Sequence, residues 1–140
     1  MSEQRNYFSS AVYLAQKTFV FRADGKFLTL LRSDISLTRP GAWDLPGGAY
    51  EQGDTPKESA QREIVEETGI TITEIKPLDV RGHKNSVGEY VITIAYRTQT
   101  ASEDVTLSSE HTDYRWVTPE EFLTLESSAK WQSIVRDNLL

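Results

Sequence analysis

The chain has 140 residues and a net charge of −6, which makes nucleic acid and anionic membranes unfavourable partners, and its length predicts one domain over residues 1–140. It contains no cysteine, which excludes disulfides, thiolate metal sites and cysteine nucleophiles. The N-terminus is polar and no apolar run approaches the roughly 20 residues that span a bilayer, so we expect a cytoplasmic protein without a membrane segment.

The first third of the chain predicts a β-hairpin, a loop and a short strand. A turn signal at Ala23-Asp24-Gly25 separates two runs with the composition of strands. Two later breaks in the pattern are Pro40-Gly41 and Pro46-Gly47-Gly48. We therefore expect, in order, a hairpin over residues 9–32, a loop over 33–42, a short strand over 42–45 and a turn at 46–48.

The most regular pattern predicts a helix over residues 56–68. Thr55 and Glu58 have the spacing of a capping box, Pro56 suits the first helical position, and Gly69 suits the C-terminal cap. The elements expected after this helix are strands over residues 70–80, 90–97 and 114–117, a short helix over 119–125, and an amphipathic helix at the C-terminus. This order predicts an α/β (α+β mixed) fold, in which helices pack on the faces of a mixed sheet.

Three glutamates gather on one side of the predicted helix. Glu63, Glu66 and Glu67 stand at positions i, i+3 and i+4, which places their side chains close together. Their mutual repulsion costs a few tenths of a kcal/mol for each pair, and the negative end of the helix dipole adds to it. A bound Mg²⁺ ion would compensate this charge, because Mg²⁺ prefers carboxylate oxygens. The alternative is a solvated acidic face, in which Arg62 pairs with Glu66.

Residues 48–70 resemble the Nudix box, the signature of the Nudix hydrolase family, which includes MutT-like proteins. The box consists of Gly, five residues, Glu, seven residues, Arg-Glu, an aliphatic residue, any residue, Glu-Glu, any residue, Gly and an aliphatic residue. The matching positions are Gly48, Arg62, Glu63, Ile64, Glu66, Glu67, Gly69 and Ile70. Asp54 stands where the family usually has Glu. Six of the matches require a single residue type, so chance agreement is on the order of one in ten million.

The resemblance implies an α/β/α sandwich around a mixed β-sheet and a hydrolase that cleaves a diphosphate linkage with Mg²⁺ or Mn²⁺. The metal ligands that it implies are Glu63, Glu66, Glu67 and the carbonyl of Gly47. Arg62 is expected to orient a box carboxylate, and the shorter Asp54 to meet Arg62 from farther away than Glu would. Glu63 is the first candidate for the base that takes a proton from the attacking water. Glu110 and Asp113, which both precede the last predicted strand, are alternatives for this role or for a further ligand.

Recognition of the rest of the substrate must come from outside the box. Trp43 and Tyr50 are candidates for stacking on a base, and Arg32 and Arg81 are candidates for contacting phosphates. We rank nucleoside triphosphates first as substrates, with the monophosphate and pyrophosphate as products. Nucleoside diphosphate sugars such as ADP-ribose come second, and dinucleoside polyphosphates third.

Two hypotheses of another class stay open beside the enzyme. One is a non-catalytic Nudix-fold module that senses a nucleotide, and the other is a structural domain whose acidic helix binds nothing. The three intact helical carboxylates favour the enzyme. The sequence leaves a homodimer open, since many such domains pair but no feature here requires it.

Overall fold

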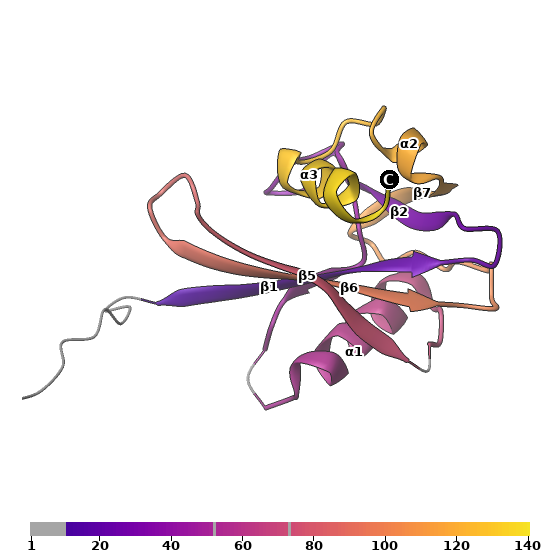
Figure 1. The fold of residues 1–140 in the computed structure, drawn as a ribbon, viewed down its shortest axis with the longest axis horizontal. Coiled ribbons are helices and arrows are strands. Elements are labelled where there is room, and N and C mark those ends of the chain that lie inside the picture. The colour runs from indigo at the N-terminus through magenta and orange to yellow at the C-terminus, as the bar shows by residue number, and fades with distance from the viewer. Residues whose placement is uncertain (1–10, 52, 73) are drawn as a thin grey trace, which may run out of the picture.

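A seven-stranded mixed sheet forms the middle of the molecule, and helices cover both of its faces (Figure 1). The computed structural model describes residues 11–51, 53–72 and 74–140. The strands are β1 (Val12–Phe21), β2 (Phe27–Arg32), β3 (Trp43–Asp44), β4 (Gly47–Ala49), β5 (Ile75–Lys84), β6 (Tyr90–Gln99) and β7 (His111–Val117). The helices are α1 (Pro56–Thr68), α2 (Pro119–Phe122) and α3 (Ala129–Asn138).

Strand β1 lies at the centre of the sheet. The strands follow the order β3-β2-β1-β6-β5, while β4 also pairs with β1 and β7 with β2. β1 and β6 are parallel along their whole length, and every other pairing is antiparallel. A parallel pair needs a long crossover connection, and the chain between β1 and β6 includes α1. The predicted mixed sheet is confirmed.

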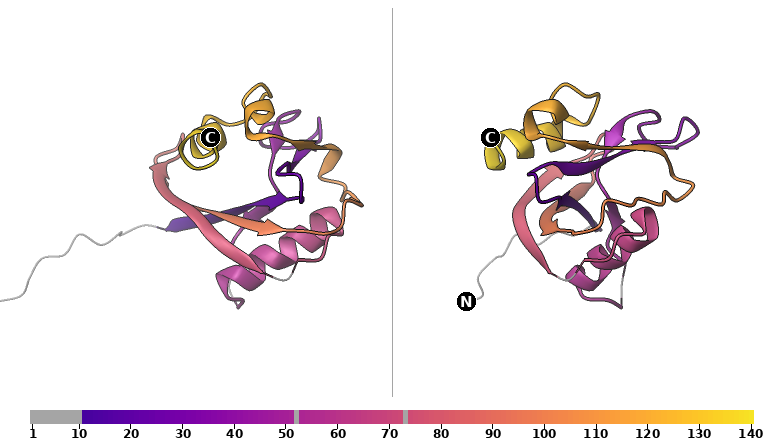
Figure 2. Two further views of the ribbon diagram at one scale, coloured as in Figure 1. Left: turned by 45° about the vertical axis from the view of Figure 1, so that its right-hand side comes forward. Right: turned by 90° about the vertical axis from the view of Figure 1, so that its right-hand side faces the viewer.

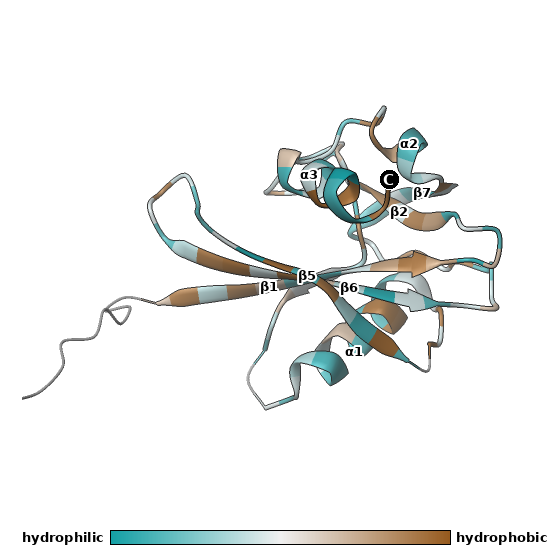
Figure 3. Ribbon diagram, in the orientation of Figure 1, coloured by the Kyte–Doolittle hydropathy of each residue, from teal (hydrophilic) through white to brown (hydrophobic). Residues whose placement is uncertain are grey.

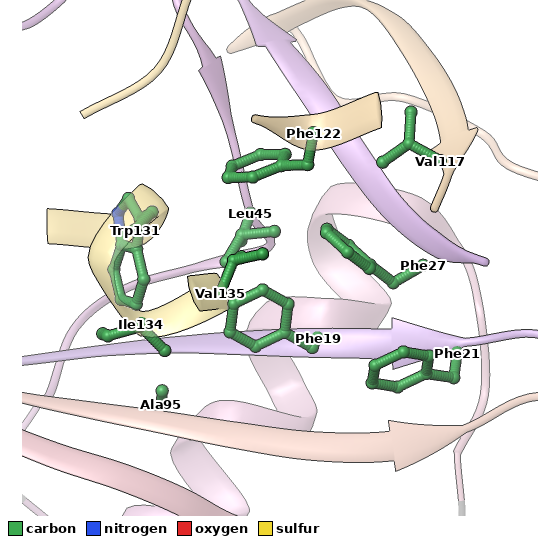
Figure 4. Packing of buried hydrophobic residues seen from close by; sticks show 10 residues of the cluster. All are labelled: Phe19, Phe21, Phe27, Leu45, Ala95, Val117, Phe122, Trp131, Ile134 and Val135. Carbon is green, nitrogen blue, oxygen red and sulfur yellow. The ribbon is translucent and has the colours of Figure 1, made fainter. Parts of the chain in front are cut away.

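Alternation along β1 sends neighbouring side chains into two separate cores. Phe19 and Phe21 face α2 and α3, whereas Val20 between them joins the core under α1. Figure 4 shows the core under α2 and α3, which contains Phe19 and Phe21. The core under α1 contains Ile64 and Ala60 of that helix. Hydrophobic and hydrophilic bands alternate along β5 in the same way (Figure 3). With α1 on one face and α2 and α3 on the other, the layers form the expected α/β/α sandwich (Figure 2).

Aromatic contacts tie the two C-terminal helices to the sheet. The ring of Phe27 lies 5.0 Å from that of Phe19 and 5.4 Å from that of Phe122 on α2. Phe19 also contacts Trp131 on α3, with 6.4 Å between the ring centroids. Such pairs add roughly 0.5–1.5 kcal/mol each beyond the burial of their area.

The predicted bounds of α1 are confirmed by its caps. The hydroxyl of Thr55 accepts a hydrogen bond from the backbone N–H of Glu58, and Gly69 ends the helix with φ 70° and donates its N–H to the carbonyl of Val65. Thr55 alone thus makes the N-cap bond of α1, whereas α2 begins with a full capping box, in which the side chain of Glu121 also accepts from the N–H of Thr118. Among the described residues, no helix is long and apolar enough to cross a membrane.

The prediction of a turn at residues 46–48 is wrong, because Gly47–Ala49 forms β4 and pairs with β1. Gly47 has φ 141°, and a Cβ there would lie 2.0 Å from the carbonyl oxygen of Gln16. Glycine is therefore needed for the close approach of the two strands, and not for a turn.

Several other bounds differ from the predictions. The predicted strand over residues 70–80 is β5, which begins five residues later, at Ile75, and continues to Lys84. Its bounds differ because pairing with β6 determines them. β6 and β7 are each longer than predicted, and α2 ends at Phe122 and not at residue 125. Residues 9 and 10 of the predicted hairpin lie outside the described residues.

Candidate active site

The last turns of α1 and a segment before β7 enclose a pocket with a volume of about 360 Å³. Five carboxylates and two hydroxyl side chains line it: Glu51, Glu63, Glu66, Glu67, Ser108, Ser109 and Glu110. The structure thus brings the three predicted box glutamates together with Glu110, although more than forty residues separate Glu67 from Glu110 in the sequence.

Strand β4 lies directly against the carboxylates of α1. Burial of Ile64 and Ala60 against the sheet turns the flanking glutamates toward β4. One carboxylate oxygen of Glu67 accepts a hydrogen bond from the N–H of Gly47 at 3.1 Å. A Cβ at Gly48 would lie 3.8 Å from the carboxylate of Glu63. The two glycines therefore lie directly against the carboxylates of Glu67 and Glu63.

The C-terminal end of α1 holds the segment that carries Glu110. Thr106 donates its backbone N–H to the carbonyl of Thr68 at 2.8 Å, and Ser108 donates to the carbonyl of Glu67 at 3.4 Å. The last carbonyls of a helix have no partner within it, so these bonds satisfy them. Val105 and Leu107 pack against the core below. This connection explains how a loop acid reaches the box glutamates.

The carboxyl groups of this site lie so close together, and are so buried, that the fold disfavours their negative charge. Burial raises the pKa of Glu67 to about 8, against the opposing effects of Lys17 and the N–H of Gly47, while Glu63 and Glu110 raise it further. Burial also raises the pKa of Glu63, and repulsion from Glu66 adds to this. Glu67 is only 4% exposed, so a carboxylate there needs a nearby positive charge.

Lys17 supplies part of that positive charge from β1. Its ammonium donates to a carboxylate oxygen of Asp44 at 3.0 Å and to the carbonyl of Gly47 at 3.3 Å. Burial would raise the pKa of Asp44, but Lys17, the N–H of Leu45 and Arg32 together hold it below its ordinary value. Sequence reasoning missed Lys17. The available signal was the single charged residue of a segment that is predicted to be a strand.

Arg62 connects the box helix to the loop before it. Its guanidinium donates directly to the carboxylate of Asp54 and lies 3.7 Å from carboxylate oxygens of Glu51 and of Glu66. The expected pairing of Asp54 with Arg62 is confirmed. The hydroxyl of Tyr50 donates to the carbonyl of Asp54 and so ties this loop together.

The donor atoms of the site suit a hard divalent cation. Mg²⁺ and Mn²⁺ prefer carboxylate oxygens, and five carboxyl groups line this pocket. No three acidic or histidine side chains within the described ranges are already gathered as a metal cage. The buried Glu67, with its raised pKa, and the repulsion among its neighbours nevertheless favour the binding of positive charge at this place.

Several predicted residues, Tyr50, Arg32, Trp43, Arg81 and Asp113 among them, do not line the carboxylate pocket. Trp43 is buried, with the guanidinium of Arg115 4.7 Å from its ring centroid, so it is not available to stack on a substrate. Arg81 donates to the side chains of Ser133 and Asp137 on α3 and is engaged there. Asp113 lies exposed on β7, where its carboxylate accepts from the N–H of Tyr114.

Comparisons with known proteins agree with this geometry. The NUDIX domain family model matches residues 14–138. The nucleoside triphosphatase NudI of Escherichia coli O81 (strain ED1a) is 31% identical over 138 residues, which cover 88% of this chain and 96% of that protein. A MutT protein from Methanosarcina mazei Go1 has a crystal structure that matches with a TM-score of 0.82 at 31% identity, over 94% of this chain and 95% of that one.

A more distant likeness concerns the fold alone. The MutT NUDIX hydrolase from Burkholderia pseudomallei is 20% identical and matches with a TM-score of 0.75, over 91% of this chain and 98% of that one. The family match spans nearly the whole chain, and the glutamates of the box line one pocket while the carboxylate of Glu67 accepts from the N–H of Gly47 in β4. This protein therefore belongs to the NUDIX domain family and is a MutT-like Nudix hydrolase.

Proposed function

We propose that this enzyme hydrolyses a nucleoside triphosphate to the monophosphate and pyrophosphate, with Mg²⁺ or Mn²⁺ as cofactor. The observation that carries the proposal is the pocket lined by five carboxylates, in which the buried Glu67 has a pKa raised to about 8. Such a site repels a polyphosphate unless cations lie between them. The name of the NudI relatives, nucleoside triphosphatase, supports a triphosphate substrate.

The residues that would hold the cation are Glu63, Glu66, Glu67 and the carbonyl of Gly47. When bound, a divalent cation neutralises diphosphate oxygens and lowers the pKa of a water molecule. Lys17 already contacts the carbonyl of Gly47 and adds a fixed positive charge on the same side. Arg62 lies 3.7 Å from Glu66 and is a positioning residue for it.

A carboxylate of the pocket must take the proton of the attacking water. Glu110 is exposed and lines the pocket opposite α1, which supports it as the base, with Glu63 as the alternative on the helix. Asp113 is less suited, because it does not line the pocket and accepts from the N–H of Tyr114. Location in the cytoplasm stays a prediction from the sequence.

The experiment that tests the function is a panel of nucleotides with Mg²⁺. Nucleoside triphosphates, ADP-ribose and a dinucleoside polyphosphate are compared by the release of pyrophosphate, phosphate and monophosphate. We expect the highest kcat/KM with triphosphates and pyrophosphate as the product. Release of phosphate from triphosphates, or a clear preference for ADP-ribose, would contradict the proposal.

Variants of α1 test the assigned residues. Glu67→Gln should lower kcat by two orders of magnitude or more, because an uncharged amide is a poor ligand for Mg²⁺ (about 10–100-fold in affinity even for indirect partners). Glu58→Gln is the matched control, since Glu58 is exposed in the first turn of the same helix. Equal turnover by the Glu67→Gln and Glu58→Gln variants would contradict the role of Glu67 as a metal ligand.

A further inference from the structure

A second pocket adjoins the carboxylate pocket beneath the loop of residues 33–42. It has a volume of about 440 Å³, within the range of roughly 300–1,000 Å³ that small-molecule sites occupy. The residues of its lining that matter here are Arg32, Ile35, Leu37, Gly48, Ser109 and Glu110. Of these residues, only Glu110 has a role in the chemistry derived above.

The two pockets share part of their lining. Ser109 and Glu110 line both of them. The carbonyl of Glu110 also accepts the backbone N–H of Ser33 at 3.0 Å, which attaches the start of the loop to the carboxylate site. Gly48 lines the second pocket and lies against Glu63 in the first. A molecule whose phosphates lie at the carboxylates therefore has the second pocket as a neighbouring space for its remaining part.

The loop presents two aliphatic side chains to solvent at the rim of this pocket. Ile35 is 90% exposed and Leu37 is fully exposed. A single exposed aliphatic residue is ordinary, whereas two together beside a pocket indicate a surface that a ligand covers. An apolar group that packs on these side chains removes their surface from water, which lowers the free energy of the complex.

The hydroxyl groups of the loop that line this pocket make hydrogen bonds within the loop. The hydroxyl of Ser36 accepts from Arg32 at 2.8 Å and donates to the carbonyl of Thr38 at 2.9 Å. The hydroxyl of Thr38 accepts from Arg32 at 2.9 Å. Ser33 accepts from the N–H of Ile35. The loop therefore offers a ligand mainly apolar contact.

Arg32 holds this loop to the sheet. Its guanidinium donates to the carbonyl of Thr38 at 2.8 Å and to the buried carboxylate of Asp44 at 3.0 Å, besides the two hydroxyl groups. The planar guanidinium provides several donors in fixed directions, which a lysine cannot reproduce. The sequence-based prediction that Arg32 contacts phosphate thus gives way to a role in positioning the loop.

We propose that the second pocket receives the base and sugar of the nucleoside triphosphate, and that Ile35 and Leu37 pack on the base. This rests on the proposed function, because the carboxylates must hold the phosphates. Apolar contact with a flat ring discriminates weakly between bases, whereas hydrogen bonds would discriminate strongly. The loop contributes affinity for the nucleoside and only slight selection among bases.

The double variant Ile35→Ser/Leu37→Ser tests the apolar contact. We expect KM for a nucleoside triphosphate to rise about tenfold or more, with a much smaller change in kcat, because the loop does not touch the phosphates. Both side chains are exposed, so thermal unfolding should be unaffected. Val87→Ser, at a 75% exposed position in the turn between β5 and β6, is the matched control and should leave KM unchanged.

Ribose 5-triphosphate, which lacks a base, completes the test. The double variant should raise its KM by less than about twofold, because the contact that the variant removes is already missing. Arg32→Lys should raise KM for the nucleoside triphosphate and spare ribose 5-triphosphate. A similar rise for both substrates would mean that Arg32 binds phosphate and would overturn its positioning role.

The outcomes separate this inference from the proposed function. An unchanged KM of the double variant on a nucleoside triphosphate, with turnover by the wild type, overturns the base pocket and leaves the proposed function intact. Failure of the wild type to release pyrophosphate from any nucleoside triphosphate refutes the proposed function itself. A tenfold rise in KM that is absent with ribose 5-triphosphate supports both.

Discussion

Replacing Glu67 by glutamine should stabilise the metal-free protein near neutral pH while it abolishes activity. The wild type buries a carboxyl group whose ionised form the fold disfavours, so its pKa is raised from 4.5 to about 8. A group with a raised pKa in the folded state contributes its stability fully below its unfolded pKa, and this stability is lost as pH rises through the folded pKa. Glutamine does not ionise and keeps an oxygen that can accept from Gly47.

The size of the effect follows from the shift. Each pKa unit corresponds to about 1.4 kcal/mol, and between about pH 4.5 and pH 8 Glu67 ionises in the unfolded chain but not in the folded one. Near pH 7 the wild type has therefore lost roughly 3 kcal/mol of the stability that it has at low pH. The advantage of Glu67→Gln should therefore grow by roughly 2–3 kcal/mol between about pH 5.5 and about pH 7.5. For a chain of this length, that corresponds to roughly 5–10 °C in Tm.

The assay is urea or thermal unfolding in EDTA across this range of pH, for the wild type and the variant together. Glu66→Gln on the same helix is the control, because the Glu66 side chain is 59% exposed whereas Glu67 is buried. A difference between Glu67→Gln and the wild type that does not change with pH would refute the reasoning, whatever its size.

Other changes test the cation and packing of the same region. Mg²⁺ should raise the Tm of the wild type and leave Glu67→Gln nearly unaffected, as thermal scans with and without the ion would show. Lys17→Met should lower the free energy of unfolding by roughly 3 kcal/mol in urea titrations, since the buried Asp44 loses a cation 3.0 Å away. Gly47→Ala should destabilise the fold by about 3 kcal/mol or more, and a variant that unfolds like the wild type would contradict the close approach of β4 to β1. Phe122→Ala should cost roughly 3–5 kcal/mol, because its ring is fully buried between α2 and the sheet.

Features that depend on local chemistry could be predicted from the sequence. The bounds of α1 follow from Thr55 at one end and Gly69 at the other, and the gathering of Glu63 with Glu67 follows from helical spacing. These signals lie within one or two turns of the residues that they place. The element type was therefore correct wherever a cap or a strong alternation was present.

Features that depend on contacts between distant segments could not be predicted. Gly47 resembles a turn residue locally, and only its pairing with β1 makes it part of a strand. Lys17 gives no local sign of its contact with Asp44, and Arg32 gives none of its bonds to its own loop. Glu110 was predicted as one of two loop acids, and only the attachment of Thr106 to the end of α1 distinguishes it from Asp113.

The central position of β1 limits where the length of this chain can change. Deletion of one residue from the strand would shift its register, so that each displaced side chain would point to the opposite face of the sheet. The phenylalanines would then face α1, Val20 would face α2 and α3, and Lys17 would leave the active site. The turn after β5 is different, since residues 85–88 lie beyond the last sheet pair, Lys84 with Tyr90. An inserted peptide tag or a fluorescent label at this turn would leave both cores and the catalytic carboxylates in register.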